Sequence, residues 1–261
     1  MENFKKKYGP WALISGASSG LGAEYARQLA PKGMNLILVA RRKDRLDTLA
    51  KELSEEYSID TRTIQADLTS PDFIEKITPV TDGLEVGLLI NNAGFATTGH
   101  FLELPLEGEL DLLHLNCRAP LILTHHFGNL MKTRNRGGII IVASLVAFIA
   151  APNWVGYSTS KVWDLYFGHA LWGELRGTGI DVQALCPGAT HTEFGKVAGT
   201  RSRGGSMPAP PVIAESLRKF GKKPFVIAGT KNKFLYSLTR LLPRSMMTVV
   251  FGKMLDKLKS Q

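Results

Sequence analysis

Short apolar runs alternate with longer amphipathic segments along most of the chain, and this alternation constrains the fold more than any other feature. The runs Asn35–Ala40, Val86–Asn91 and Gly138–Ala143 are apolar along almost their whole length, as strands are when both faces of a sheet are covered. Strands and helices that alternate in this way form parallel βαβ units. The sequence therefore predicts an α/β fold, a doubly wound parallel sheet of Rossmann type.

The expected elements follow from this alternation. Strands are predicted at Trp11–Ser15, Asn35–Ala40, Thr61–Ala66, Val86–Asn91, Gly138–Ala143 and Asp181–Leu185. Helices are predicted at Ala23–Pro31, Lys43–Tyr57, Pro71–Val80, Leu104–Arg134 with an interruption at Pro120, and Tyr157–Gly177. Gly195–Pro211, rich in Gly, Ser, Arg and Pro, predicts a mobile loop. The 261 residues fit a single catalytic domain, residues 1–230, followed by a helical extension, residues 231–261.

A glycine-rich turn, Gly16 to Gly22, follows the first strand directly and precedes a helix. Glycines let the backbone turn sharply and approach a pyrophosphate, and the helix N-terminus offers free N–H groups to phosphates. The spacing is G-x-x-x-G-x-G, which differs from the general dinucleotide fingerprint and from the phosphate loop of ATPases. Alone, such a turn has an alternative interpretation as a turn without a ligand, and the strand–turn–helix context favours the nucleotide site.

Two arginines, Arg41 and Arg42, stand at the end of the second strand, where an NAD site usually has a carboxylate. Arginine can stack on adenine or pair with a 2′-phosphate, so this end favours NADP(H) over NAD(H). The alternative is that both side chains lie in solvent. Asp67, after the third strand, either bonds the adenine amino group or caps the next helix.

Ser144 ends the fifth strand, and Tyr157 and Lys161 follow it four residues apart. On a helix, positions i and i+4 share a face. A cation about 4 Å from the phenol contributes roughly 4 kcal/mol at an effective dielectric constant of 20. The spacing therefore predicts a Tyr157 phenol whose pKa falls by up to about three units, less the cost of burial, and which exchanges a proton near neutrality.

The glycine turn, Asn91-Asn92-Ala93-Gly94, Asn116, the Ser144/Tyr157/Lys161 set and Pro187-Gly188 occur in one order. In this order they resemble the motifs of the short-chain dehydrogenase/reductase family over about residues 9 to 194. The resemblance implies that Tyr157 is the general acid/base, that Lys161 lowers its pKa and binds the nicotinamide ribose, and that Ser144 holds the substrate oxygen. It also implies that Asn116 bends its helix and holds a water in a proton relay.

The resemblance further implies a cofactor site and an NADP-preferring variant of the family. The implied cofactor contacts are Gly16, Ser18, Ser19, Gly20, Leu21, Gly22, Arg41, Arg42, Asp67, Leu68, Asn92, Ala93, Gly94, Tyr157, Lys161, Pro187, Gly188, Thr190 and Thr192. Some NADP-dependent members carry a basic residue inside the glycine turn. Ser18 and Ser19 stand there in this chain, so a 2′-phosphate would depend on Arg41 and Arg42 alone.

The expected activity is hydride transfer between NADP(H) and an apolar carbonyl compound or secondary alcohol. Trp154 and Phe148, between Ser144 and Tyr157, either line the substrate site or pack in the core, and His191 is a candidate pocket residue. The alternatives are an NADP-binding redox sensor and a membrane-surface interaction protein, both without turnover. The family resemblance also implies a homodimer or homotetramer, assembled through the long helices after the fourth and fifth strands.

Positive charge is concentrated at the end of the chain. Of the net charge of +9, the segment Arg218–Gln261 contributes 11 Lys/Arg against one acidic residue, Asp256. The rest is nearly neutral, which argues against a nucleic-acid partner. In residues 231–261, Met247, Val250, Phe251, Met254 and Leu258 recur at helical spacing beside lysines. This basic amphipathic stripe either packs on the body or a second subunit, or touches an anionic membrane surface.

The cysteines and histidines predict no further chemistry. Cys117 and Cys186 lie far apart in apolar segments, which favours buried free thiols and suits a reducing compartment. The six histidines lack the close spacing of zinc ligands, so no metal site is expected. The N-terminus has no apolar run of the length that a signal peptide needs. The expected location is therefore the cytoplasm, with weak peripheral membrane contact as an option for the tail.

Overall fold

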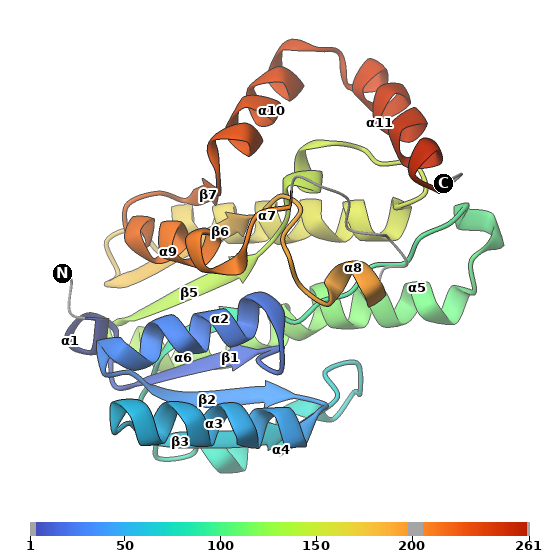
Figure 1. Ribbon diagram of the computed structural model, residues 1–261. Coiled ribbons are helices and arrows are strands. Elements are labelled where there is room, and N and C mark those ends of the chain that lie inside the picture. The colour runs from blue at the N-terminus through green and yellow to red at the C-terminus, as the bar shows by residue number, and fades with distance from the viewer. Residues whose placement is uncertain (1–3, 198–205, 260–261) are drawn as a thin grey trace.

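The computed structural model describes residues 4–197 and 206–259, and side chains up to Gly195 and between Ser206 and Lys253 (Figure 1). The strands are β1 (Trp11–Ser15), β2 (Asn35–Ala40), β3 (Thr61–Gln65), β4 (Val86–Asn91), β5 (Gly137–Val142), β6 (Ile180–Cys186) and β7 (Phe225–Ile227). The α-helices are α1 (Phe4–Tyr8), α2 (Gly20–Leu29), α3 (Lys43–Tyr57), α4 (Phe73–Thr81), α5 (Leu106–Leu113), α6 (Ala119–Arg134), α7 (Val155–Glu174), α8 (Phe194–Val197), α9 (Ala209–Lys219), α10 (Thr230–Leu241) and α11 (Arg244–Lys259).

The strands form one parallel seven-stranded sheet in the order β3-β2-β1-β4-β5-β6-β7. The order reverses between β1 and β4, because β2 and β3 continue on one side and β5 to β7 on the other. In an open α/β sheet, this switch point opens a crevice at the carboxyl ends of the strands. The predicted doubly wound Rossmann-type fold is confirmed.

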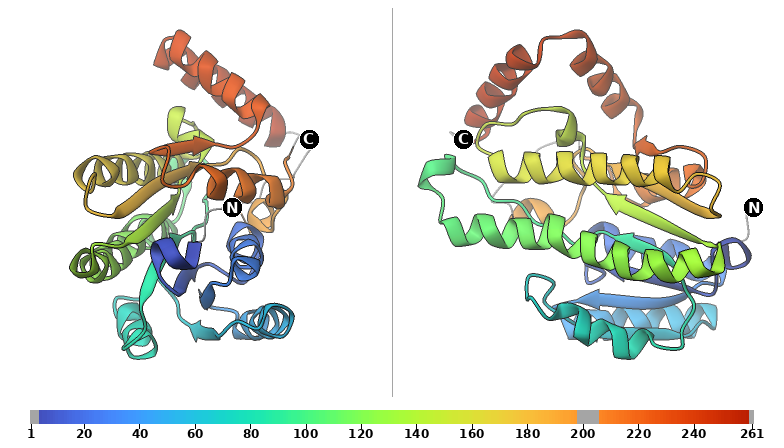
Figure 2. Two further views of the ribbon diagram at one scale, coloured as in Figure 1. Left: turned by 90° about the vertical axis from the view of Figure 1, so that its left-hand side faces the viewer. Right: turned by 180° about the vertical axis from the view of Figure 1, so that it is seen from behind.

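Helices cover both faces of the sheet, as Figure 2 shows. Residues of α2, α3 and α9 pack with one set of strand side chains, and residues of α4, α6 and α7 pack with the opposite set. The central strands β1, β4 and β5 are buried along their whole length. This double burial is the reason that their sequences are continuous apolar runs rather than alternating ones.

The long helix after β4 contains a π-helical turn at His114–Arg118, between α5 and α6. The predicted interruption at Pro120 is therefore wrong by a few residues. Pro120 lies in the first turn of α6, and it has no N–H for the carbonyl of Asn116, four residues before it. Its ring also crowds that carbonyl. The proline thus disturbs the turn that precedes it rather than the position where it stands.

Two short helices, one short strand and the helix α9 were not predicted. The helix α8 has four residues and lies at the start of the segment predicted as a loop. The helix α1 has five residues and the strand β7 has three, too few for a periodic pattern to stand out. The helix α9 begins at Ala209, inside the segment predicted as a loop, and proline occupies its first turn, where a missing N–H costs nothing. Of that predicted loop, residues 198–205 lie outside the described part of the chain. Among the other elements, β1, β2, β4 and α3 have the predicted bounds, and the remaining ends differ from prediction by at most three residues.

The basic extension consists of two helices, α10 and α11, separated at Leu242-Pro243 (Figure 1). Of the predicted apolar stripe, Met247 is buried and Phe251 is half-buried, whereas Val250 is exposed. The side chains of Met254 and Leu258 lie outside the described part. Part of the stripe therefore packs on the body. Among residues 4–197 and 206–259, none of the helices has both the length and the apolar character that crossing a membrane requires.

Candidate active site

The glycine turn after β1 packs directly against the loop after β4. Gly16 and Gly20 have φ values of 67° and 58°, in the left-handed region that favours glycine. A Cβ at Gly22 would lie 2.4 Å from the carbonyl oxygen of Gly16 and 2.6 Å from the amide nitrogen of Asn92. The Asn92 amide donates to the Ser15 carbonyl oxygen at 2.9 Å. Glycine is required because no room is left for a side chain between the two loops.

The start of α2 is open at this turn. Ser19 is the N-cap residue, but its side chain makes no capping bond and accepts a hydrogen bond from Arg42 at 2.8 Å instead. A helix N-terminus in this state offers backbone N–H groups and the positive end of the helix dipole to an anion. The turn is thus a cradle of the kind that holds a pyrophosphate.

Arg42 stands at the centre of a polar cluster beside the turn. It donates to Ser18 Oγ at 3.0 Å and Ser19 Oγ at 2.8 Å, and it forms an ion pair with Glu193 at 2.8 Å. Arg45, on α3, pairs with the same carboxylate at 2.7 Å. The hydrogen bonds from Arg45 and Arg42 lower the pKa of Glu193 to about 2. Arg41, in contrast, has a side chain that is 75% exposed.

The sequence alone does not identify Arg45 and Glu193 as members of this cluster. They belong to segments about 150 residues apart, and neither stands in a recognised motif. Arg45 is therefore a further guanidinium beside Arg42, in addition to the two arginines that the sequence suggests for a 2′-phosphate.

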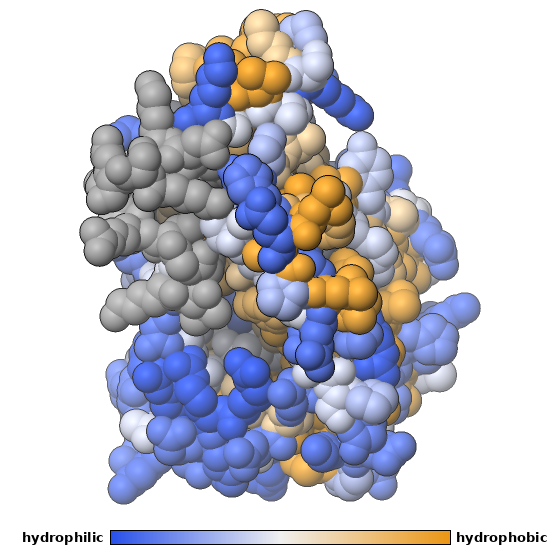
Figure 3. Space-filling model, turned by 90° about the vertical axis from the view of Figure 1, so that its right-hand side faces the viewer, coloured by the Kyte–Doolittle hydropathy of each residue, from blue (hydrophilic) through white to orange (hydrophobic). Residues whose placement is uncertain are grey.

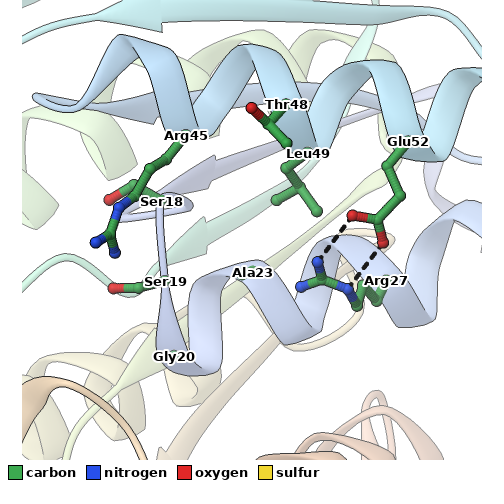
Figure 4. Close-up of a pocket in the computed structure, with 9 residues that line it drawn as sticks. All are labelled: Ser18, Ser19, Gly20, Ala23, Arg27, Arg45, Thr48, Leu49 and Glu52. Carbon is green, nitrogen blue, oxygen red and sulfur yellow. Dashed lines mark hydrogen bonds and ion pairs between the residues drawn. The ribbon is translucent and has the colours of Figure 1, made fainter.

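A pocket of about 290 Å³ lies between α2 and α3, next to this cluster. Figure 4 shows Arg45 directed toward Ser18 at one end and the Arg27–Glu52 pair at the other. Hydroxyl and guanidinium donors at the first end suit an anion. The pocket thus adjoins the glycine turn, which contributes Ser18, Ser19 and Gly20 to its lining.

Asp67 lies at the carboxyl end of β3, and its side chain closes a turn. Its Oδ1 accepts from the backbone N–H of Thr69 at 3.0 Å and from the Thr69 hydroxyl at 2.8 Å. Its Oδ2 lies 3.9 Å from Arg41. Leu68 is buried. Asp67 therefore does not cap the next helix, α4, whose N-cap residue is Asp72, and it closes the turn before that helix instead.

Ser144, Tyr157 and Lys161 come together at the carboxyl end of β5. Tyr157 is 7% exposed and forms a hydrogen bond with the Ser144 side chain. Lys161 lies one turn further along α7, and its Nζ donates to the Val142 carbonyl oxygen at 2.9 Å and to Asp164 Oδ2 at 2.8 Å. The three side chains thus share one buried site, as their spacing predicts.

The pKa of Tyr157 departs from the sequence-based expectation. Burial raises it, the ammonium of Lys161 and the hydrogen bond with Ser144 lower it, and Asp164 raises it again. The net direction is upward from the ordinary value of a phenol. The predicted effect of Lys161 is confirmed, but the predicted net lowering is wrong for the protein without cofactor. The phenol is protonated at neutral pH and is therefore ready to donate.

Asn116 lies in the π turn and connects three segments. Its amide nitrogen donates to the Phe95 carbonyl oxygen and to Ser160 Oγ, both at 3.0 Å, and its Oδ1 accepts from the Phe95 N–H at 3.1 Å. Gly94, just before Phe95, leaves room for both Asn116 and Lys161. The helix distortion expected at Asn116 is present, and the residue fixes the loop after β4 against α7.

The segment after β6 joins the two halves of the site. Pro187 accepts a hydrogen bond from Leu145 N at 2.8 Å, beside Ser144. The Thr190 hydroxyl donates to the Gly188 carbonyl oxygen at 3.0 Å. A Cβ at Gly20 would lie 3.1 Å from Thr192, so Thr192 faces the glycine turn. This segment therefore runs from Ser144 to the glycine turn, and it joins the parts of the site that the family resemblance assigns to substrate and to cofactor.

Aromatic side chains form an apolar wall above Tyr157. Its ring centroid lies 5.7 Å from that of Trp154 and 5.5 Å from that of Phe194, and Trp154 lies 6.3 Å from Phe251 of α11. Phe251 is a wall residue that the sequence analysis did not assign to the site. We call Trp154, Phe194 and Phe251 the aromatic wall.

Two other candidates for this wall lie elsewhere. Phe148 packs with Phe225 and Tyr236, in a separate cluster, so its core alternative holds. His191 has an exposed side chain, and its backbone N–H donates to the Met207 carbonyl oxygen. Cys186 is buried as expected, whereas Cys117, in the π turn, is only half-buried.

Comparisons with known proteins agree with this geometry. The short chain dehydrogenase family matches residues 10–202. The 7beta-hydroxysteroid dehydrogenase of Collinsella aerofaciens is 31% identical, with 88% of this chain and 90% of that protein covered. Human 17-beta-hydroxysteroid dehydrogenase type 3 is 33% identical over 76% of this chain and 65% of that protein.

Solved structures show the same fold. A structure described in a study of 7beta-hydroxysteroid dehydrogenase stereoselectivity superposes with a TM-score of 0.90 at 27% identity, over 96% of this chain and 99% of that chain. A short-chain dehydrogenase from Sphingobium yanoikuyae in complex with NADPH has a TM-score of 0.79 at 34% identity, over 84% and 87% of the two chains. With the cradle, the buried Ser144–Tyr157–Lys161 site and these matches together, the chain belongs to the short chain dehydrogenase family and is an oxidoreductase that acts on CH–OH or C=O groups.

Proposed function

We propose that this protein reduces a bulky apolar ketone to a secondary alcohol with NADPH. The observation that carries the proposal is the buried Tyr157, which lies one helical turn before Lys161 and beside Ser144, below the aromatic wall. The test is NADPH consumption with a panel of ketones that includes steroid ketones and long-chain 3-oxoacyl thioesters. Turnover of these and not of small polar ketones is expected, and no turnover of any ketone with either nicotinamide cofactor would contradict the proposal.

The residues of the site divide the work of reduction among them. A nicotinamide held in the glycine cradle would supply the hydride. Ser144 holds the substrate oxygen in reach of the Tyr157 hydroxyl, which donates its proton to that oxygen as negative charge develops on it. Lys161, one turn away, stabilises the phenolate that remains. The aromatic wall keeps water from the reacting carbon.

The cluster around Arg42 supports NADP(H) as the preferred cofactor. Three donors that suit a 2′-phosphate lie there, namely Arg42, Ser18 and Ser19, and Arg45 is next to them. The cradle fits a dinucleotide because its glycines leave no side chain in the way. Glu193 now neutralises the two arginines, and it would have to yield to the phosphate.

Replacing Arg42 with alanine is expected to lower the preference for NADPH over NADH by about 10- to 100-fold, because a hydrogen bond to a charged group contributes about 1.5–3 kcal/mol. The measurement is kcat/KM for each cofactor. Lys51→Ala is the control, since Lys51 is exposed on the same helix α3 and pairs only at 3.9 Å, with Glu55. An unchanged preference in Arg42→Ala would show that the 2′-phosphate does not bind there.

The aromatic wall and the names of the relatives support a large apolar substrate. Two of the relatives named above are hydroxysteroid dehydrogenases, and a third, at 31% identity, is the human very-long-chain 3-oxoacyl-CoA reductase. Their named substrates share a carbonyl or hydroxyl carbon on an extended apolar skeleton. The aromatic wall beside Tyr157 suits such a skeleton.

Replacing Phe251 with alanine is expected to raise KM for the apolar ketone about tenfold and to leave KM for NADPH within about twofold, because the lost apolar contact is worth about 1–2 kcal/mol. Steady-state kinetics measures both constants. The control is Phe234→Ala, the same change at a residue that is 67% exposed on α10. Equal effects of the two variants would place Phe251 outside the substrate site.

The subunit assembly and the cellular location of the protein are predicted from the sequence alone. The helices expected to join subunits in a homodimer or homotetramer are α5 and α6 after β4, and α7 after β5. Each carries exposed apolar side chains, among them Leu106, Leu110, Leu121, Val162 and Tyr166. Leu241 and Val250 on the extension are also exposed, beside basic residues. Contact of this side with a lipid surface, and a cytoplasmic location, remain predictions from the sequence.

A further inference from the structure

A buried carboxylate, Asp164, lies next to the catalytic lysine and has no part in the mechanism described so far. It stands on α7, three residues after Lys161, and its Oδ2 lies 2.8 Å from Lys161 Nζ. The two side chains are only 3% and 6% exposed. The two charges of a buried ion pair attract each other strongly, because little water is present to screen them.

The ammonium of Lys161 is held from two sides. The Val142 carbonyl oxygen, at the end of β5, accepts one of its protons at 2.9 Å, and Asp164 accepts another at 2.8 Å. Burial by itself lowers the pKa of Lys161. The interactions with Asp164 and Tyr157 raise this pKa by more, so that the net shift is upward. Asp164 thus fixes the position of this ammonium and keeps it charged.

The groups that face Asp164 come from three elements. Lys161 and Tyr157 share its helix, Cys117 lies in the π turn, and Cys186 ends β6. Burial raises the pKa of both cysteine thiols, so they are uncharged at neutral pH. The charge of Asp164 therefore acts on one cation, the Lys161 ammonium, and on one titrating phenol, Tyr157.

A carboxylate so close to the Lys161 ammonium changes the electrostatic potential at the Tyr157 phenol. A lone cation stabilises a nearby phenolate, whereas a cation paired with an anion acts as a dipole, whose effect falls off faster with distance. Lys161 lowers the pKa of Tyr157, and Asp164 raises it. Burial raises the pKa of Asp164 itself to about 6, in spite of Lys161, so the carboxylate is ionised at neutral pH.

We propose that Asp164 is a positioning residue, which holds the Lys161 ammonium in place and partly shields its charge from Tyr157. The shielding keeps the phenol in its proton-donating form through the neutral range, so the proton donor for ketone reduction stays available there. This inference rests on the proposed function, because it concerns the proton donor of that same reaction.

The test compares Asp164→Asn, which removes the charge at nearly constant shape, with the wild-type enzyme. In ketone reduction, kcat/KM falls as the pH rises through the pKa of Tyr157, because the protonated phenol is the donor. With the shield removed, that fall is expected to move about one unit toward lower pH. Asp164→Glu, which restores a carboxylate, should return it toward the wild-type position. Glu174→Gln, an exposed acid on the same helix, should leave it unmoved.

A merely structural role would lower kcat at every pH without moving the profile, and that result overturns the inference, as does a shift toward higher pH. If Asp164→Asn does not fold, the wild-type profile decides, since shielding requires that the fall in kcat/KM lie no lower than the ordinary range of a phenol, and a fall nearer neutrality contradicts it. Titration of ¹³C-labelled tyrosine without cofactor, assigned with Tyr157→Phe, should show the same shift. That readout separates failure of this inference from absence of ketone turnover, which would count against the proposed function instead.

Discussion

Replacing Tyr157 with phenylalanine is expected to lower kcat by about 10³-fold while the Kd for NADPH stays within about twofold. Proton transfer by a positioned side chain contributes about 10²- to 10⁴-fold to a rate, and the variant has no proton to give. The phenyl ring keeps the contacts with Trp154 and Phe194. Single-turnover kinetics and equilibrium binding of NADPH measure the two quantities separately.

The matched control is Tyr25→Phe. Tyr25 is also buried, and its hydroxyl has a serine partner, Ser216, at 2.8 Å, but it lies on α2, away from the carboxyl ends of β5 and β6. This variant should be less stable by about 1 kcal/mol and should keep its full activity. Retention of a tenth or more of the wild-type turnover by Tyr157→Phe would show that another group donates the proton.

The sequence predicts the sheet well, because its central strands are buried on both faces and admit little besides apolar residues. It also predicts the cradle, because two loops meet there so closely that Gly16 and Gly22 tolerate no side chain. Ser144, Tyr157 and Lys161 lie together as expected, because two of them are one helical turn apart and the third ends a neighbouring strand. In each of these cases, a local pattern determines the structure.

The features that the sequence does not reveal depend on contacts between distant segments. Glu193 becomes part of the cofactor cluster only because the segment after β6 folds back over α3. Phe251 reaches Trp154 because the chain turns at Leu242-Pro243. Asp164 lies three residues after Lys161, but it is buried because α7 packs on the sheet. Residue spacing in the sequence does not predict this burial. The net pKa of Tyr157 was mispredicted for the same reason.

Replacing Gly22 with alanine is expected to weaken NADPH binding about 100-fold and to remove most of the activity at ordinary cofactor concentrations. The added Cβ would lie 2.4 Å from the Gly16 carbonyl oxygen and 2.6 Å from the Asn92 amide, so the glycine turn and the loop after β4 have to separate. Overpacking of this kind costs about 1–3 kcal/mol, and here the displaced groups are those that would hold the pyrophosphate. Equilibrium binding of NADPH and thermal unfolding are measured side by side.

Gly173→Ala makes the same substitution on α7, at an exposed helical position where the added Cβ meets nothing within 4 Å. This control should bind NADPH normally and gain about 0.5–1 kcal/mol of stability, because alanine is the better helix former. If Gly22→Ala binds NADPH as tightly as this control does, the cofactor does not approach the turn closely. The cradle would then be a packing feature of the sheet, and the proposed cofactor site would have to lie elsewhere along the carboxyl edge.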